Sequence, residues 1–181
     1  MAGFRVAGID VGLKRSHIAV LDRCKVIYVG LYGECDLDFD FAGIDAPLSF
    51  PTKGHFRECE RRLHEMGIRV LPPKFIEGIA RRGMAIAEEL RRRGVEVYEV
   101  YPYATRVILN IAPKANKRKK EGRIEIAKSL RRFVEFGELK SHDDLDAVIS
   151  ALTVKLYIEG MGERLGEIII PKPSKSRILE P

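Results

Sequence analysis

The sequence predicts an α/β domain built on a mixed sheet of five strands flanked by helices. Apolar runs of strand length fill positions 4–46 and return at 95–100, whereas helical spacing of apolar residues dominates the remainder. The elements follow the order β-β-β-β-α-α-β-α-α-α. Because helical crossovers join parallel strands, strands one, four and five should be parallel neighbours. Strands one to three should form an antiparallel meander.

The expected strands end at turn residues. Gly-Ile-Asp-Val-Gly closes the first strand, Pro47 and Pro102 follow the ends of the fourth and fifth, and only Arg23 and Cys24 separate the second from the third. That short connection predicts a tight hairpin. Strands are expected at 4–12, 16–22, 25–32, 41–46 and 95–100, with a candidate late strand at 167–171.

The remaining segments are predicted to be helical, and Gly78 and Gly83 predict a bend or break in the second helix. Repeats and linker composition are absent from the sequence, so we expect one domain over residues 1–181 with a loose tail at 172–181. Helices are expected at 55–66, 75–93, 103–111, 121–136 and 142–159.

Composition bounds the class of protein. The chain has 181 residues, 45% of them hydrophobic, which is enough for a core and argues against disorder. The apolar runs fall short of the roughly 20 residues of a membrane span, and the N-terminus does not have the pattern of a signal peptide. We therefore expect a cytoplasmic protein.

Two further features of composition are informative. The scattered Cys24, Cys35 and Cys59 do not have the spacing of a zinc site. Charged residues make up 32% of the chain and glutamine is absent from it, which resembles the composition of thermophile proteins.

Acidic residues are expected to meet at one edge of the sheet. Asp10, Asp45 and Glu99 lie at or near the ends of strands one, four and five. Asp143 and Asp146 open the last long helix and, three positions apart, share one helix face. Ligands bind at the carboxyl ends of parallel strands, so these acids are candidate catalytic residues. The small residues that follow on that face would let the helix approach the sheet closely.

Such a group of carboxylates predicts a metal site. Carboxylates in one pocket repel one another unless cations neutralise them. Oxygen ligands favour Mg²⁺ or Mn²⁺, and two such ions roughly 4 Å apart can cleave a phosphodiester. We therefore expect Asp10, Asp45, Asp143 and Asp146 to hold two Mg²⁺ or Mn²⁺ ions.

The sequence also resembles known families. GIDVG followed by a hairpin, a fourth strand ending in an acid, and a helix opening Asp-x-x-Asp-Ala look like the RNase H-like fold. VYEVYPYATRVIL and DDLDAVISAL are similar to the fifth strand and last helix of RuvC-type Holliday-junction resolvases. The whole pattern, with AGIDAPLSFP, ECERRL, YEVYP and EIIIP, resembles a family of unknown function described as predicted RNase H-fold nucleases.

The resemblance implies a metal-dependent nuclease that hydrolyses DNA or RNA. Asp10, Asp143 and Asp146 match metal ligands of the resolvases, and Asp45 stands where they carry a glutamate. Glu99 matches a glutamate outside their core ligands. Resolvases act as dimers, so a homodimer is a further expectation.

A basic segment precedes the last two helices. Between positions 110 and 132 there are nine basic residues and two acidic ones, in a chain of net charge +6. In a nuclease these side chains would contact the phosphate backbone, although charge runs are often only solvated. The expected contacts are Lys114, Lys117, Arg118, Lys119 and Lys120.

Simpler roles remain open for several of these residues. Asp143 could only cap its helix, Asp45 could cap a turn, and Glu99 could pair with an arginine. Asp144 is expected to be solvated and His142 to be a surface histidine. The rival functions are a nucleic-acid-binding module without catalysis and an actin- or sugar-kinase-like nucleotide-binding protein. The latter normally needs two copies of the first-strand motif, and this chain has one.

Overall fold

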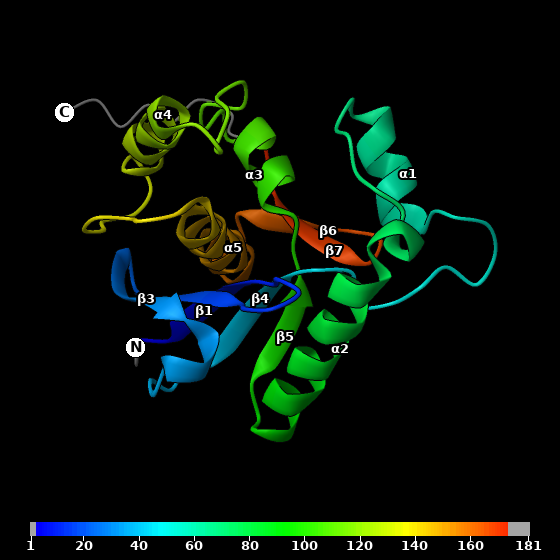
Figure 1. Cartoon of the computed structure of the whole chain (residues 1–181), viewed down its shortest axis with the longest axis horizontal. Helices are drawn as coiled ribbons and strands as arrows, with labels where there is room; N and C mark the ends of the chain where they lie inside the picture. The colour runs from blue at the N-terminus through cyan, green and yellow to red at the C-terminus, as the bar shows by residue number, and fades with distance from the viewer. Residues whose placement is uncertain (1–2, 174–181) are drawn as a thin grey trace.

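A single sheet organises the computed structural model, which describes residues 3–173. Its seven strands follow the order β3-β2-β1-β4-β5-β7-β6 (Figure 1). β1 pairs antiparallel with β2 and parallel with β4, and β4 pairs parallel with β5. These directions confirm the predicted mixed α/β sheet, with strands one to three antiparallel and strands one, four and five parallel. The strands are β1 (Arg5–Asp10), β2 (His17–Asp22), β3 (Lys25–Leu31), β4 (Phe41–Asp45), β5 (Glu96–Glu99), β6 (Gly162–Leu165) and β7 (Ile168–Pro171).

The sheet is larger than the five strands predicted. The late strand at 167–171 exists as β7, parallel to β5, and β6 pairs antiparallel with it. The prediction missed β6 because its sequence, Gly-Glu-Arg-Leu, buries only its two end residues at the sheet edge. The predicted loose tail lies outside the described residues from position 174 onward.

Helices cover both faces of the sheet. α5 and α4 pack on one face, and α2 packs on the other (Figure 1). α1 and α3 share a smaller core with β6 and β7. Among the described residues, no helix combines the length and apolarity needed to cross a membrane. The helices are α1 (Glu58–Glu65), α2 (Glu77–Arg92), α3 (Pro102–Ile108), α4 (Lys120–Leu130) and α5 (His142–Ile158), with short 3₁₀ helices η1 (Tyr32–Glu34) and η2 (Pro73–Ile76).

The bend or break predicted from Gly78 and Gly83 is not present at either glycine. η2 is separate, but α2 then runs through Gly78 and Gly83 without interruption. A Cβ at position 83 would lie 2.5 Å from the Cβ of Ala46, so this glycine lets α2 approach the residue that follows β4. Gly83 therefore serves close packing.

α5 crosses the sheet in close contact with β1, as the small-residue face predicted. A Cβ on Gly8 would overlap the carbonyl oxygen of Ala147 and the backbone nitrogen of Ala151, and would lie 2.8 Å from the Cβ of Ser150. The close approach brings the first turns of α5 to the ends of β1 and β4, where the predicted acids lie.

Candidate metal centre

Three of the predicted acids form one cluster. Asp10 and Asp45 end neighbouring parallel strands and are register partners, which sets their carboxylates side by side. Asp146 joins them from α5 and is buried. One carboxylate oxygen from each lies within 4.8 Å of the others. Residues separated by more than 100 positions are thus close enough to share an ion.

Burial raises the pKa values of all three acids, and mutual repulsion adds to the rise for Asp10 and Asp45. Burial raises the pKa of Asp10 to about 8, with further contributions from the charges of Asp146 and Asp143. Burial, followed by the charges of Asp146 and Asp10, raises the pKa of Asp45 well above its usual value. A divalent cation would relieve both the repulsion and the desolvation. The all-oxygen donor set fits Mg²⁺ or Mn²⁺.

Lys117 reaches into this cluster from the basic segment. Its Nζ pairs with Asp146 Oδ2. Burial alone would lower the pKa of Lys117, but Asp146 and the other acids outweigh that effect and raise it. Burial still raises the pKa of Asp146 against the opposing charge of Lys117. Lys117 is therefore a counter-ion to the acids when no metal ion is bound.

Arg106 fixes the backbone that leads to Lys117. Its guanidinium is buried and donates to the carbonyl oxygens of Ile111, at 3.2 Å, and Ala115, at 3.0 Å. The rest of the predicted basic contacts face solvent: Lys114, Arg118, Lys119 and Lys120 are all exposed.

Asp143 lies at the more open side of the cluster. Hydrogen bonding to Asp143 contributes to the raised pKa of Asp10, so the two carboxyl groups are neighbours. Its Oδ1 lies 3.1 Å from Nε2 of His142, which is partly exposed. The alternative that Asp143 caps the helix is ruled out, because Ser141 caps α5 and accepts from the backbone nitrogen of Asp144 at 3.0 Å.

Asp144 is buried, which contradicts the prediction that it would be solvated. Its Oδ2 accepts from the backbone nitrogens of Lys140 and Ser141, and its Oδ1 accepts from His17 Nδ1 at 2.7 Å. His17 has no ligand spacing in the sequence, yet its Nε2 lies 3.9 Å from Asp143 Oδ2. The one signal for a role of His17 is its place at the start of β2, where it is the register partner of Asp10.

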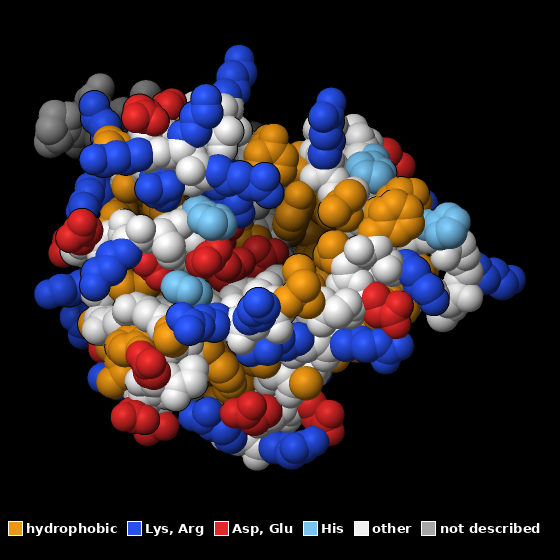
Figure 2. All heavy atoms as spheres, in the orientation of Figure 1, with side chains coloured by type: hydrophobic (Ala, Val, Ile, Leu, Met, Phe, Trp, Pro, Cys, Tyr) orange, Lys and Arg blue, Asp and Glu red, His pale blue; other side chains and the backbone are white. Residues whose placement is uncertain are grey.

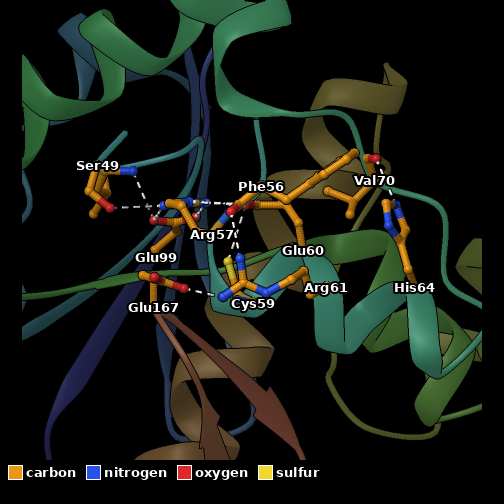
Figure 3. Close-up of polar contacts among 11 residues, drawn as sticks. Ser49, Phe56, Arg57, Cys59, Glu60, Arg61, His64, Val70, Glu99 and Glu167 are labelled. Carbon is orange, nitrogen blue, oxygen red and sulfur yellow. Dashed lines mark hydrogen bonds and ion pairs between the residues drawn. The ribbon is translucent and has the colours of Figure 1, made fainter. Parts of the chain in front are cut away.

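Glu99 belongs to a different group of side chains (Figure 3). Its Oε1 and Oε2 accept from the Arg57 guanidinium at 2.6 and 2.8 Å, and Oε2 also accepts from the backbone nitrogen of Leu48. Arg57 binds Glu60 as well, with Nε 3.0 Å from Oε1. The pairing with an arginine, which the sequence left open, is thus present, and it holds the chain after β4 against β5 and α1.

Two hollows flank the acid cluster. One, of about 220 Å³, is lined by Asp45, Asp146, Arg106 and Lys117 together with the chain at 101–103. The other, of about 230 Å³, begins at Asp10 and Asp45 and is mostly apolar. In Figure 2, acidic side chains gather near the middle of the visible face, beside a hollow with hydrophobic walls.

Comparison with known proteins assigns the chain to a family. The family described as "Protein of unknown function (DUF429)" matches residues 8–169, and the chain belongs to it. A search of proteins with curated functions finds no match. Two solved structures of RuvC from Thermus thermophilus are similar, and each alignment covers 86% of this chain and 96% of the other. The structure of T. thermophilus RuvC in complex with Holliday junction substrate has 15% identity and a TM-score of 0.48, and the second RuvC structure has 14% and 0.43.

Proposed function

We propose that this member of the DUF429 family is a metal-dependent nuclease that hydrolyses phosphodiester bonds in DNA or RNA. The observation that carries the proposal is the grouping of Asp10, Asp45 and Asp146 within 4.8 Å at the carboxyl ends of parallel strands. Buried carboxyl groups that repel one another are costly to maintain, and binding a divalent ion would offset that cost.

The ligands in this proposal are Asp10, Asp45 and Asp146, with Asp143 completing the set beside Asp10. Bound there, one or two Mg²⁺ or Mn²⁺ ions would supply an activated water and offset the charge that develops on the phosphate. The acids must release their protons to bind the ion, so affinity should rise with pH. Lys117 would balance the charge of Asp146 and offer a cation at the edge of the site.

The basic segment supports nucleic acid as the substrate. Lys114, Arg118, Lys119 and Lys120 are exposed on the stretch of chain that delivers Lys117 to the acids. Phosphate backbones bind such side chains with strong dependence on salt. Glu99 takes no part as a ligand in this proposal, because Arg57 and the backbone of Leu48 engage both of its oxygens.

One observation favours a second candidate, a nucleic-acid-binding module without catalysis. Lys117 already pairs with Asp146, so the cluster is partly neutralised without any ion. If the protein is such a binding module, Lys117→Met should weaken nucleic-acid binding, and adding Mg²⁺ should not change the affinity for nucleic acid. In the nuclease, Lys117→Met removes a competitor and should tighten Mg²⁺ binding several-fold, whereas Lys119→Met, at an exposed neighbour, should not.

Cleavage assays test the proposal directly. Single-stranded, duplex and branched DNA and RNA are incubated with Mg²⁺, Mn²⁺ or EDTA. Wild-type protein should cleave at least one substrate with a metal and none with EDTA, and Asp45→Asn should reduce the rate at least 100-fold. Asp38→Asn, at an exposed acid, is the matched control and should cleave as wild type does. Absence of metal-dependent cleavage across the whole panel would refute the nuclease assignment.

A further inference from the structure

The apolar hollow beside Asp10 and Asp45 is a built cavity. It occupies about 230 Å³ between the end of β4, α1, η2 and β5. This is smaller than the roughly 300–1,000 Å³ of sites for drug-sized ligands, so it suits one compact group. Its apolar walls are formed by Leu63, Val70, Leu71, Ile76, Ile79, Val100, Tyr101 and Ile168.

Exposed apolar side chains extend these walls to the surface. Leu71, on the wall itself, is 56% exposed, and Phe75, next to Ile76, is 71% exposed. Leu13, which would meet a Cβ placed on Gly78 of α2, is 67% exposed. Large exposed apolar residues on the wall of a cavity and beside its lining segments indicate a binding surface, because water solvates them poorly.

The cavity is also lined by charged side chains that already pair with one another (Figure 3). All five N–H groups of the Arg57 guanidinium have partners among the described residues: Ser49, Glu60 and Glu99. Arg57 therefore offers no donor to an anion, and a phosphate or carboxylate entering here would meet two glutamates. The cavity suits an uncharged group with apolar faces.

A nucleotide has the same division of chemistry as this surface. Its phosphate is an anion that fits the metal ions proposed at the acid cluster, with Lys117 at their edge. Its base is uncharged, flat and apolar on both faces, and bases are commonly held between apolar or aromatic side chains. The two environments adjoin, since Asp10 and Asp45 line both the cavity and the candidate metal centre.

We propose that this cavity takes one unpaired nucleobase of the strand whose phosphate lies at the acid cluster. The inference rests on the proposed function and narrows its substrate class. A base paired within a duplex cannot enter a cavity of this size, and extruding one costs a few kcal/mol. The preferred substrates are therefore single strands, or duplexes with an unpaired or extruded nucleotide beside the bond that is cut.

The test uses oligonucleotides with 2-aminopurine at successive positions, bound in Ca²⁺ to hold the strand intact. This base brightens when it leaves the base stack. Ile76→Trp fills the cavity, and Leu71→Ala, at a largely exposed residue, shortens its wall with little risk to folding. Ile27→Trp is the matched control, since Ile27 lies on β3 at the opposite edge of the sheet. Calorimetry with Mg²⁺ checks the metal centre of each variant.

We expect brightening at one position and at least tenfold weaker binding of that strand by Ile76→Trp, with a smaller loss for Leu71→Ala. The control should bind as wild type, and Mg²⁺ affinity should be equal in all four proteins. The same signal at every position, or unchanged binding by both cavity variants, would overturn the inference. If the inference fails but metal-dependent cleavage is observed, the proposed nuclease function still holds. If the base binds but cleavage is absent, only the proposed nuclease function is refuted.

Discussion

His17 Nδ1 lies 2.7 Å from Asp144 Oδ1 and joins two residues that are 127 positions apart. Asp144 Oδ2 is taken by the backbone nitrogens of Lys140 and Ser141. The carboxylate therefore ties the start of β2 to the first turn of α5. Because Asp143 and Asp146 stand on that turn and the next, this contact sets where they present their oxygens.

Asp144→Asn should lower both stability and metal affinity. The amide cannot accept all three hydrogen bonds with equal strength, so the free energy of unfolding should fall by about 1–3 kcal/mol. Urea unfolding measures this, and calorimetry should show weaker Mg²⁺ binding. His64→Ala, which removes a histidine on α1 that contacts only the carbonyl of Val70 among its described hydrogen-bond partners, is the control. Equal Mg²⁺ affinity in Asp144→Asn and wild type would remove Asp144 from this positioning role.

Gly8→Ala should displace α5 from the sheet. The added methyl group would overlap backbone atoms of Ala147 and Ala151, which cannot rotate away. Overpacking of this kind costs about 1–3 kcal/mol or more. Thermal unfolding should show a clearly lower midpoint than for Gly137→Ala, where a Cβ meets no described atom within 4 Å. Similar midpoints for the two variants would contradict the close approach of α5 to β1.

The metal-free protein should lose stability as pH rises. The pKa of Asp10 is about 8 in the folded protein, against an ordinary value of 3.8 that applies once the chain unfolds. Between these values the folded state holds a proton that the unfolded state releases, so the free energy of unfolding falls with increasing pH. Asp10→Asn replaces this titrating carboxyl group with a neutral amide. The free energy of unfolding of the variant should therefore exceed that of wild type at pH 8, by on the order of 2 kcal/mol.

Urea unfolding in EDTA at pH 5 and pH 8 measures the effect, with Asp38→Asn as the control. A wild-type protein that is equally stable at both pH values would contradict the raised pKa. Added Mg²⁺ should restore stability to wild type at pH 8, because an ion that binds only the folded state stabilises it.

Glu99→Gln should lower the free energy of unfolding without changing the affinity for Mg²⁺. Its carboxylate pairs with Arg57, and removing one partner of a buried ion pair leaves charge uncompensated. Arg57→Met, which leaves both Glu60 and Glu99 without their cation, should cost more, about 3–5 kcal/mol. Chemical unfolding ranks the two variants. A loss of Mg²⁺ affinity in Glu99→Gln as large as in Asp45→Asn would restore Glu99 to the ligand set.

Local patterns were enough to predict the core of the sheet. The strand-like runs and helical crossovers led to the parallel order of β1, β4 and β5, and Asp10 and Asp45 had to end side by side once that order was set. The spacing of Asp143 and Asp146 predicted their common side of the helix. These features depend on neighbours within one element or on connections that the chain order imposes.

Contacts between distant segments were not predictable in the same way. The pairing of His17 with Asp144 depends on how α5 settles against β2, and Asp144 looked like a solvated acid in its local sequence. Lys117 belongs to a run of similar basic residues, and it is distinguished by its ion pair with Asp146, which depends on how Arg106 anchors the preceding backbone. β6 has too few buried residues to show a strand pattern of its own.

Mg²⁺ binding measured by calorimetry at pH 8 tests the central claim that Asp10 and Asp146 serve one metal centre. Wild type is compared with Asp10→Asn, Asp146→Asn and the control Asp38→Asn. We predict that the two cluster variants each lose at least tenfold in affinity while the control binds as wild type. Wild-type affinity in both cluster variants, or absence of binding in wild type itself, would contradict the account.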